Sequence, residues 1–176
     1  MLPRKVQVKL YATSRQDSSL ESYIPTFHRW IKDSLCDELM IDVADYGHVP
    51  HGPGVVLVGH GSDYSIDEGE GRPGLLYFRK RALSEGAELV SDALLRVLSA
   101  AQRLDEDPEV LGPKSFGTRE ILFTFPDRLA VQNDEPGLEK VRPLLDKALA
   151  EKFSGVSYQL TRTGDSRAPL TVRAEA

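Results

Sequence analysis

The strongest constraint on the fold is that the hydrophobic pattern of the chain switches repeatedly between a two-residue and a 3.6-residue period. Residues 5–13, KVQVKLYAT, alternate with Val6 and Val8 on one face, which indicates a half-buried strand. Residues 85–104 instead carry apolar side chains at helical spacing. These are Leu89, Val90, Ala93, Leu94, Val97, Leu98 and Ala101. Such a stripe must bury against a sheet or another helix.

Two further segments have helical spacing and contain prolines. In SSLESYIPTFHRWIKDSL the apolar positions share one face, and Pro25 is expected in the first turn, where its missing N–H costs nothing. The other segment opens with Asn133 or Asp134 as N-cap and has Pro136 in its first turn. Pro143 conflicts with a straight helix at that point.

The remaining apolar segments have the composition of strands. Residues 39–46, 54–64 and 74–83 are separated by turns rich in glycine and proline, which predicts an antiparallel meander. Three more strands are expected later in the chain, at 119–125, 156–163 and 168–176, the last at the sheet edge. The order βαβββαβαββ predicts an α+β fold in which a mixed, mainly antiparallel sheet carries about three helices.

Composition excludes several classes of protein. The chain has 176 residues, 40% hydrophobic and 28% charged, which predicts one folded domain over 1–176. A net charge of −5 without a basic run predicts no nucleic-acid binding, and no apolar stretch approaches the ~20 residues of a membrane span. The single cysteine, Cys36, excludes an intrachain disulfide and suits a reducing interior, so a cytoplasmic protein is expected.

Histidines cluster in DYGHVPHGPGVVLVGHGSDYSID, residues 45–67, and first suggest a metal site built from His48, His51 and His60 with Asp42 or Asp45. The predicted strand argues against it, because nine residues at ~3.3 Å each separate His60 from His51 by about 30 Å. No metal site is predicted, and only a shared ion between His48 and His51 stays open.

Pairing geometry suggests a second arrangement. With hairpins centred at residues 50 and 70, His60 lies opposite Met40 and Lys80, with Asp42 diagonal to it. Together, Asp42, His60 and Lys80 have the chemistry of a general-base site, in which a carboxylate fixes the imidazole tautomer and a cation tunes its pKa. A one-residue slip places His60 beside Arg79 instead, and the alternative interpretation is a set of charges that neutralise one another on the sheet.

No other motif carries chemistry. Cys36 is expected to be a small core residue, Ser62 lacks the GxSxG elbow, and the glycine-rich loops match no phosphate-binding pattern. We therefore expect no cofactor.

Two function classes follow. The first is a non-catalytic interaction or assembly module that pairs, through an exposed sheet face or the final edge strand, with a protein partner or a copy of itself. The second is a small enzyme or ligand-binding domain with Asp42, His60 and Lys80 as catalytic groups. Its ligand-binding residues would be His48, His51, Tyr46, Tyr64 and Arg79, with Phe78 as a further wall. The lack of a nucleophile, a metal set and a cofactor motif favours the first class.

Overall fold

The computed structural model describes residues 1–13, 20–81, 84–111 and 115–176, which form a single α+β domain. Strands and helices follow one another as β1 (Val6–Ala12), α1 (Tyr23–Lys32), β2 (Met40–Tyr46), β3 (Gly54–Gly59), β4 (Ser62–Asp67), β5 (Gly74–Arg79), α2 (Gly86–Glu106), β6 (Phe116–Phe125), α3 (Glu135–Lys152), β7 (Gln159–Thr163) and β8 (Leu170–Glu175). Short 3₁₀ turns occur at Leu20–Ser22 and Gly69–Gly71. The predicted α+β class is confirmed.

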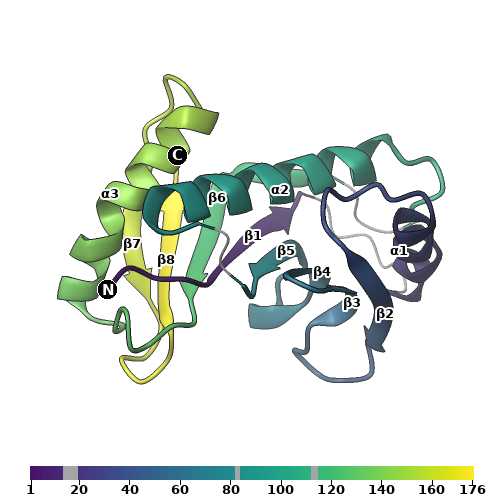
Figure 1. Cartoon of the computed structure of the whole chain (residues 1–176), viewed down its shortest axis with the longest axis horizontal. Helices are drawn as coiled ribbons and strands as arrows, with labels where there is room; N and C mark the ends of the chain where they lie inside the picture. The colour runs from purple at the N-terminus through teal and green to yellow at the C-terminus, as the bar shows by residue number, and fades with distance from the viewer. Residues whose placement is uncertain (14–19, 82–83, 112–114) are drawn as a thin grey trace.

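The eight strands form one sheet in the order β2-β3-β4-β5-β1-β6-β8-β7. Each neighbouring pair is antiparallel, including β1 with both β5 and β6. The N-terminal strand therefore lies in the middle of the sheet, and the half built from β2 to β5 joins the half built from β6 to β8 through it (Figure 1).

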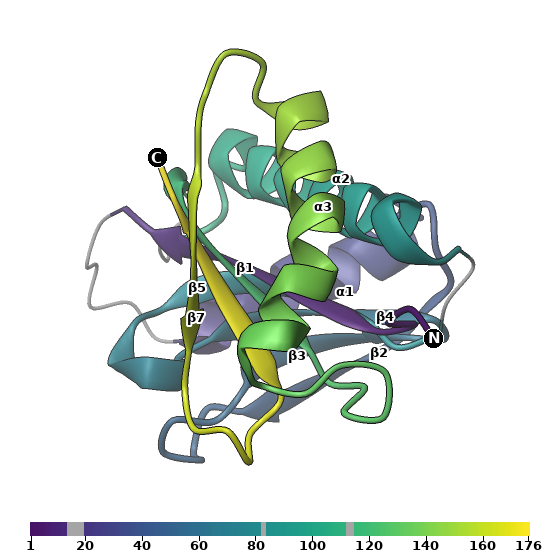
Figure 2. The ribbon, with the colours of Figure 1, turned by 90° about the vertical axis from the view of Figure 1, so that its left-hand side faces the viewer.

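All three helices bury their apolar sides on one face of this sheet. Helix α2 packs over β1 and β5, α3 over β7 and β8, and α1 over β2 and β3, while α2 and α3 also contact each other. Figure 2 shows α3 running alongside β7 and β8. Every second side chain of a strand points to the helix-covered face of the sheet. In β1 these side chains are Val6, Val8 and Leu10, which are fully buried.

The helix predictions are confirmed. Pro25 lies in the first turn of α1, and the predicted helix over 85–104 is α2. Asp134 is the N-cap of α3, and its carboxylate accepts a hydrogen bond from the Gly137 N–H at 2.8 Å. The α3 helix also continues through Pro143.

Two strand predictions are wrong. The segment expected as one strand over 54–64 turns back at His60 and Gly61, so β3 and β4 form a hairpin and the meander has four strands. The final strand is not at the edge, because β8 pairs with both β6 and β7. The sheet edges are β2 and β7.

The chain enters β3 at a position that only glycine fits. Gly54 has a φ of +65°, and a Cβ atom there would lie 2.0 Å from the carbonyl oxygen of Ile66. This close approach lets β3 pair with β4 directly after the β2–β3 turn.

The other face of the sheet carries no described helix, but the β4–β5 connection reaches over part of it. Lys9, only 3% exposed, donates there to Asp67 and to the carbonyl of Gly69, while the Tyr11 hydroxyl donates to Glu70. These contacts satisfy the buried ammonium group, so its burial is not costly.

Candidate functional site

The residues predicted to form a catalytic site do not meet. His60 is exposed in the β3–β4 turn, where its ring nitrogen lies 2.8 Å from the Arg81 guanidinium. Lys80 pairs instead with Asp63 at 2.8 Å, and the exposed Asp42 accepts a hydrogen bond from the Val43 N–H. The predicted geometry required a continuous strand through residue 60, and the turn there removes it.

The predicted ligand-binding residues separate into two groups. Exposed His48 and His51 lie in the turn after β2, and the 45% exposed Tyr46 ends that strand. Tyr64 and Arg79 are instead buried on the helix-covered face, 3% and 2% exposed. Among the described residues, no group of three or more His, Cys, Asp or Glu side chains is arranged to bind a metal ion.

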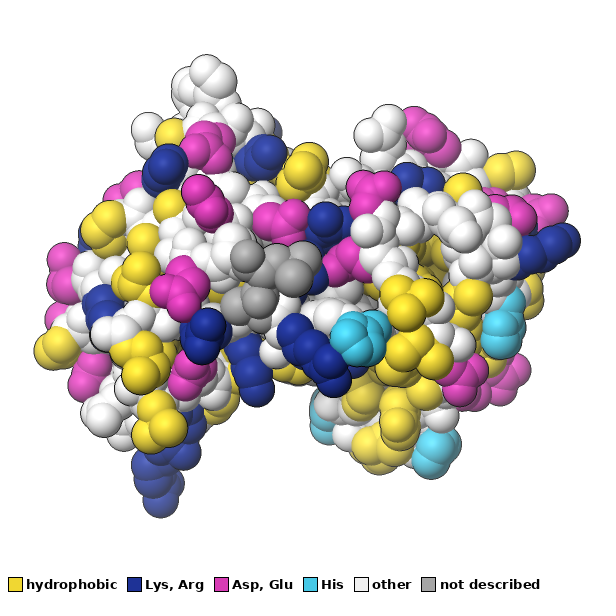
Figure 3. All heavy atoms as spheres, in the orientation of Figure 1, with side chains coloured by type: hydrophobic (Ala, Val, Ile, Leu, Met, Phe, Trp, Pro, Cys, Tyr) yellow, Lys and Arg dark blue, Asp and Glu magenta, His cyan; other side chains and the backbone are white. Residues whose placement is uncertain are grey.

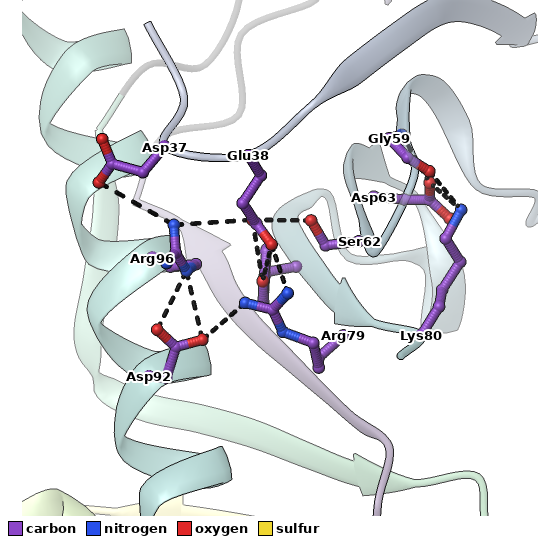
Figure 4. Close-up of polar contacts among 10 residues, drawn as sticks. Asp37, Glu38, Gly59, Ser62, Asp63, Arg79, Lys80, Asp92 and Arg96 are labelled. Atoms are coloured by element: carbon purple, nitrogen blue, oxygen red, sulfur yellow. Dashed lines mark hydrogen bonds and ion pairs between the residues drawn. The ribbon is translucent and has the colours of Figure 1, made fainter. Parts of the chain in front are cut away.

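Arg79 is the centre of a buried ionic network under α2 (Figure 4). Its guanidinium donates to Glu38, in the segment before β2, and to Asp92 of α2, the latter at 2.7 Å. Ser62 and Tyr77 also donate to Glu38, at 2.7 and 3.1 Å. Glu38 Oε1 accepts from Arg79 on β5, and Oε2 accepts from Ser62 on β4 and Tyr77 on β5. Both oxygens of the buried carboxylate therefore have side-chain partners.

Arg96 continues this network along α2. Its Nε donates to Asp92 at 3.1 Å, one helical turn away, and its guanidinium lies 3.8 Å from Glu38. Burial alone would lower the pKa of Arg96, but the hydrogen bond and charge of Asp92 and the charge of Glu38 raise it. The exposed Asp37 lies 4.0 Å from the same guanidinium, so the two arginines face two carboxylates inside the network and a third at its edge.

A small pocket adjoins this network between the end of α1, the segment before β2, strand β4 and α2. Its volume is about 110 Å³. The pocket is lined by Trp30, Leu35, Cys36, Asp37, Tyr64, Leu95, Arg96, Ser99, Ala100 and Arg103. Arg96, Ser99 and Arg103 follow one another at i, i+3 and i+7, which puts them on one side of α2.

Two aromatic side chains of the pocket carry polar atoms without a partner. Trp30 and Tyr64 are 2% and 3% exposed, and their rings meet edge to face at 6.3 Å between centroids. Neither the indole N–H nor the Tyr64 hydroxyl forms a hydrogen bond with any described residue. Among the described residues, the fully enclosed polar atoms without partners are Ser22 Oγ and Arg173 Nε. The indole N–H of Trp30 and the hydroxyl of Tyr64 are not among them, so both retain contact with solvent, which they reach at the pocket.

Cys36 lines the pocket but is not an activated thiol. Burial raises its pKa from the ordinary 9.0 to about 11, and the nearby charge of Arg103 only partly offsets that effect. A nucleophilic cysteine needs a lowered pKa, and no histidine lines the pocket to act as a base. Cys36 was expected to be a small core residue, and it lies partly buried at the margin of the core, packed against it.

No protein-family model matches this chain, and a comparison with curated proteins finds no relative. The site therefore has to be interpreted from its own geometry. No described helix is both long enough and apolar enough to cross a membrane.

Sequence reasoning missed most of this site. The sequence predicts none of Glu38, Asp92 and Arg103 as site residues. The polar row at i, i+3 and i+7 that begins at Arg96 lies beside the apolar stripe of α2, and this spacing could have indicated a polar helix face next to the core. The helical spacing of SSLESYIPTFHRWIKDSL places Trp30 on the apolar face, which is correct for its ring but predicts no role for its N–H.

Proposed function

We propose that this protein is a non-catalytic interaction module that recognises another protein through the pocket between α1, α2 and β4. The observation that carries the proposal is the pair of unpartnered polar groups on the nearly buried Trp30 and Tyr64. Both side chains are almost fully buried and their polar atoms reach solvent at this pocket, so these atoms are open to a group that binds there.

The chemistry of the pocket favours binding over catalysis. Its charged neighbours Arg79, Glu38 and Asp92 are engaged with one another, and the Cys36 thiol is protonated at neutral pH because burial raises its pKa to about 11. Nothing in the lining of the pocket supplies a nucleophile together with a base.

The size of the pocket favours one inserted side chain. Pockets that enclose drug-sized ligands have about 300–1,000 Å³. This pocket has about 110 Å³, and Leu95, 47% exposed, lies in its lining. An exposed leucine beside a small pocket suits a protein surface that inserts one group and packs apolar side chains around it.

The sheet edge at β2 is a weaker candidate for the partner surface. A register shift interrupts its pairing with β3 between Met40 and Asp42, and the Asp42 carboxylate accepts a hydrogen bond from the Val43 N–H. Bulges and charged side chains are the devices by which edge strands avoid pairing with other chains. Hydrophobic side chains are exposed on both halves of the molecule (Figure 3), so exposure alone does not single out the β2 edge.

A site-specific photo-crosslinking experiment tests the proposal. A benzoylphenylalanine placed at Leu95 should yield a discrete adduct with a partner protein in source-cell extract, and unmodified wild-type protein should compete for it. The Arg103→Glu variant, altered in the pocket, should not compete. The matched control carries the crosslinker at Leu129, which is 96% exposed and is not among the residues lining the pocket.

Three outcomes would contradict the proposal: the same adducts from both crosslinker positions, no adduct from Leu95, or equal competition by Arg103→Glu. Light scattering over a concentration series distinguishes a second copy of the chain from another protein. A dimer that is lost in Arg103→Glu would replace the hetero-partner with self-association.

A further inference from the structure

We propose that the pocket between α1, α2 and β4 binds a carboxylate group, held by the Trp30 indole N–H, the Tyr64 hydroxyl and the Arg103 guanidinium. This inference rests on the proposed function and names the chemistry of the group that the partner inserts.

The unpartnered groups of the pocket are predominantly hydrogen-bond donors. An indole N–H can only donate, a guanidinium can only donate, and the hydroxyls of Tyr64 and Ser99 can both donate. A group that satisfies several donors at once must be rich in acceptors. A carboxylate offers two oxygens with about four acceptor positions, whereas an amide or hydroxyl offers fewer and adds donors of its own.

The charges in the pocket favour an anion of charge −1. Arg96 is already engaged with Asp92 and lies near Glu38, but Arg103 forms no ion pair with any described residue. Its charge does reach the pocket, since it acts on the Cys36 thiol. Asp37, 93% exposed, lies at the rim and opposes a more highly charged ligand. Because Asp37 already lies within 4.0 Å of Arg96, Arg103 is the guanidinium left for a ligand, and one such charge suits a monoanion better than a phosphate dianion.

The donor side chains of the pocket are also held in position by their neighbours. Trp30 contacts Tyr64 edge to face, and the tilted rings of Tyr64 and Tyr77 lie 4.9 Å apart between centroids. Tyr77 is fixed in turn by its hydrogen bond to Glu38. Arg79 and Glu38 therefore orient the floor of the pocket without being among its lining residues. Donors that are already in place lose little entropy when the ligand binds.

The single tryptophan of the chain makes the test specific. The indole N–H signal of Trp30 is followed by NMR during titration with sodium acetate, with sodium chloride at equal ionic strength as the control. We expect a saturable downfield shift with a Kd of about 1–30 mM, the range for a small ion on a few contacts. Phosphate should bind more weakly than acetate.

Variants test each donor separately. Arg103→Gln should weaken acetate binding about tenfold, and Tyr64→Phe, which removes only the hydroxyl, about threefold to tenfold. The matched control is Arg119→Gln, which removes an exposed arginine on β6 that does not line this pocket and should change nothing.

Three tripeptides identify the source of the carboxylate. Ac-Ala-Glu-Ala-NH₂ presents a side-chain carboxylate, Ac-Ala-Ala-Ala-OH a chain end, and Ac-Ala-Gln-Ala-NH₂ neither. Binding of either acid peptide but not of the neutral one supports the inference and assigns the source. Binding of acetate alone supports a free small acid as ligand and overturns the inserted side chain of the proposed function.

An unchanged indole signal in acetate, an identical change in chloride, tighter binding of phosphate, or full binding by Arg103→Gln would each overturn the inference. If acetate fails while the Leu95 adduct persists, the carboxylate is wrong and the interaction module stands. If acetate binds but no adduct forms, the anion site stands and the protein partner does not.

Discussion

The Arg79 guanidinium on β5 donates to the Asp92 carboxylate on α2 at 2.7 Å, and this contact ties the longest helix to the sheet beside the candidate site. The arginine also contacts Glu38, so both carboxylates depend on the same buried cation. Removing it would leave the buried Glu38 carboxylate with Arg96, 3.8 Å away, as its remaining cation, and losing one partner of a buried ion pair is strongly destabilising.

We therefore expect Arg79→Met to lower the free energy of unfolding by about 3–5 kcal/mol, measured by urea denaturation. The matched control is Arg167→Met, whose exposed pair with Asp165 should contribute less than about 1 kcal/mol. Equal losses in the two variants would show that the buried network does not hold α2.

Stability should fall at alkaline pH in a way that depends on Cys36. Its thiol has a pKa of about 11 in the folded protein because burial disfavours the thiolate, against 9.0 when exposed. The folded state therefore binds more protons above pH 9, so the free energy of unfolding decreases as the pH rises.

Partial exposure of Cys36 reduces the effect to about 1–2 kcal/mol between pH 8 and 11. Cys36→Ala should show a correspondingly smaller decrease over this range, with denaturant midpoints measured at each pH. The buried tyrosines, whose pKa values burial also raises, remain in both proteins and act as the internal reference. If the free energies of unfolding of the wild type and Cys36→Ala decrease in parallel over this pH range, the alkaline effect does not come from Cys36.

His60 and Asp42 should be energetically independent. In a double-mutant cycle, His60→Ala and Asp42→Asn should add to within about 0.5 kcal/mol, since each has a different partner. Lys80→Ala and Asp63→Asn, which remove a contact of 2.8 Å, should instead couple by about 0.5–1 kcal/mol. Coupling of the first pair in place of the second would restore the catalytic arrangement predicted from the sequence.

The cap of α3 offers a local test. Asp134→Ala removes the acceptor of the Gly137 N–H and should cost about 1 kcal/mol in a urea titration. Asp146→Ala, an exposed change within the same helix, should be neutral or slightly stabilising because alanine is the better helix former. A smaller loss at Asp134 than at Asp146 would contradict the observed cap.

The helices could be predicted because their signals are local and long. The apolar spacing of α2 and the cap and proline at the start of α3 lie within single segments. The β3–β4 turn was missed because GVVLVGHGSDY has strand composition on both sides of His60, and only the glycines flanking that residue mark the bend.

The site could not be predicted in the same way. Glu38 and Arg79 are separated by 41 residues and Arg79 and Asp92 by 13, on three different elements. Nothing in the local pattern of any of these residues indicates its partner, because the pairing depends on how α2 lies across β5. The sequence predicts Arg79 as a ligand-binding residue and as the alternative neighbour of His60, and neither prediction indicates its pairing with Glu38 and Asp92.

The central position of β1 has a consequence for how this chain folds. Strands β2 to β5 pair through successive hairpins and close only short loops, so we expect that meander to form early. β1 precedes the other described strands in the chain but must wait for its partners, since Val6 pairs with Arg79 and Val8 with Phe123. Its insertion between two preformed halves closes the longest loops in the molecule, and we expect that step to limit the rate of folding.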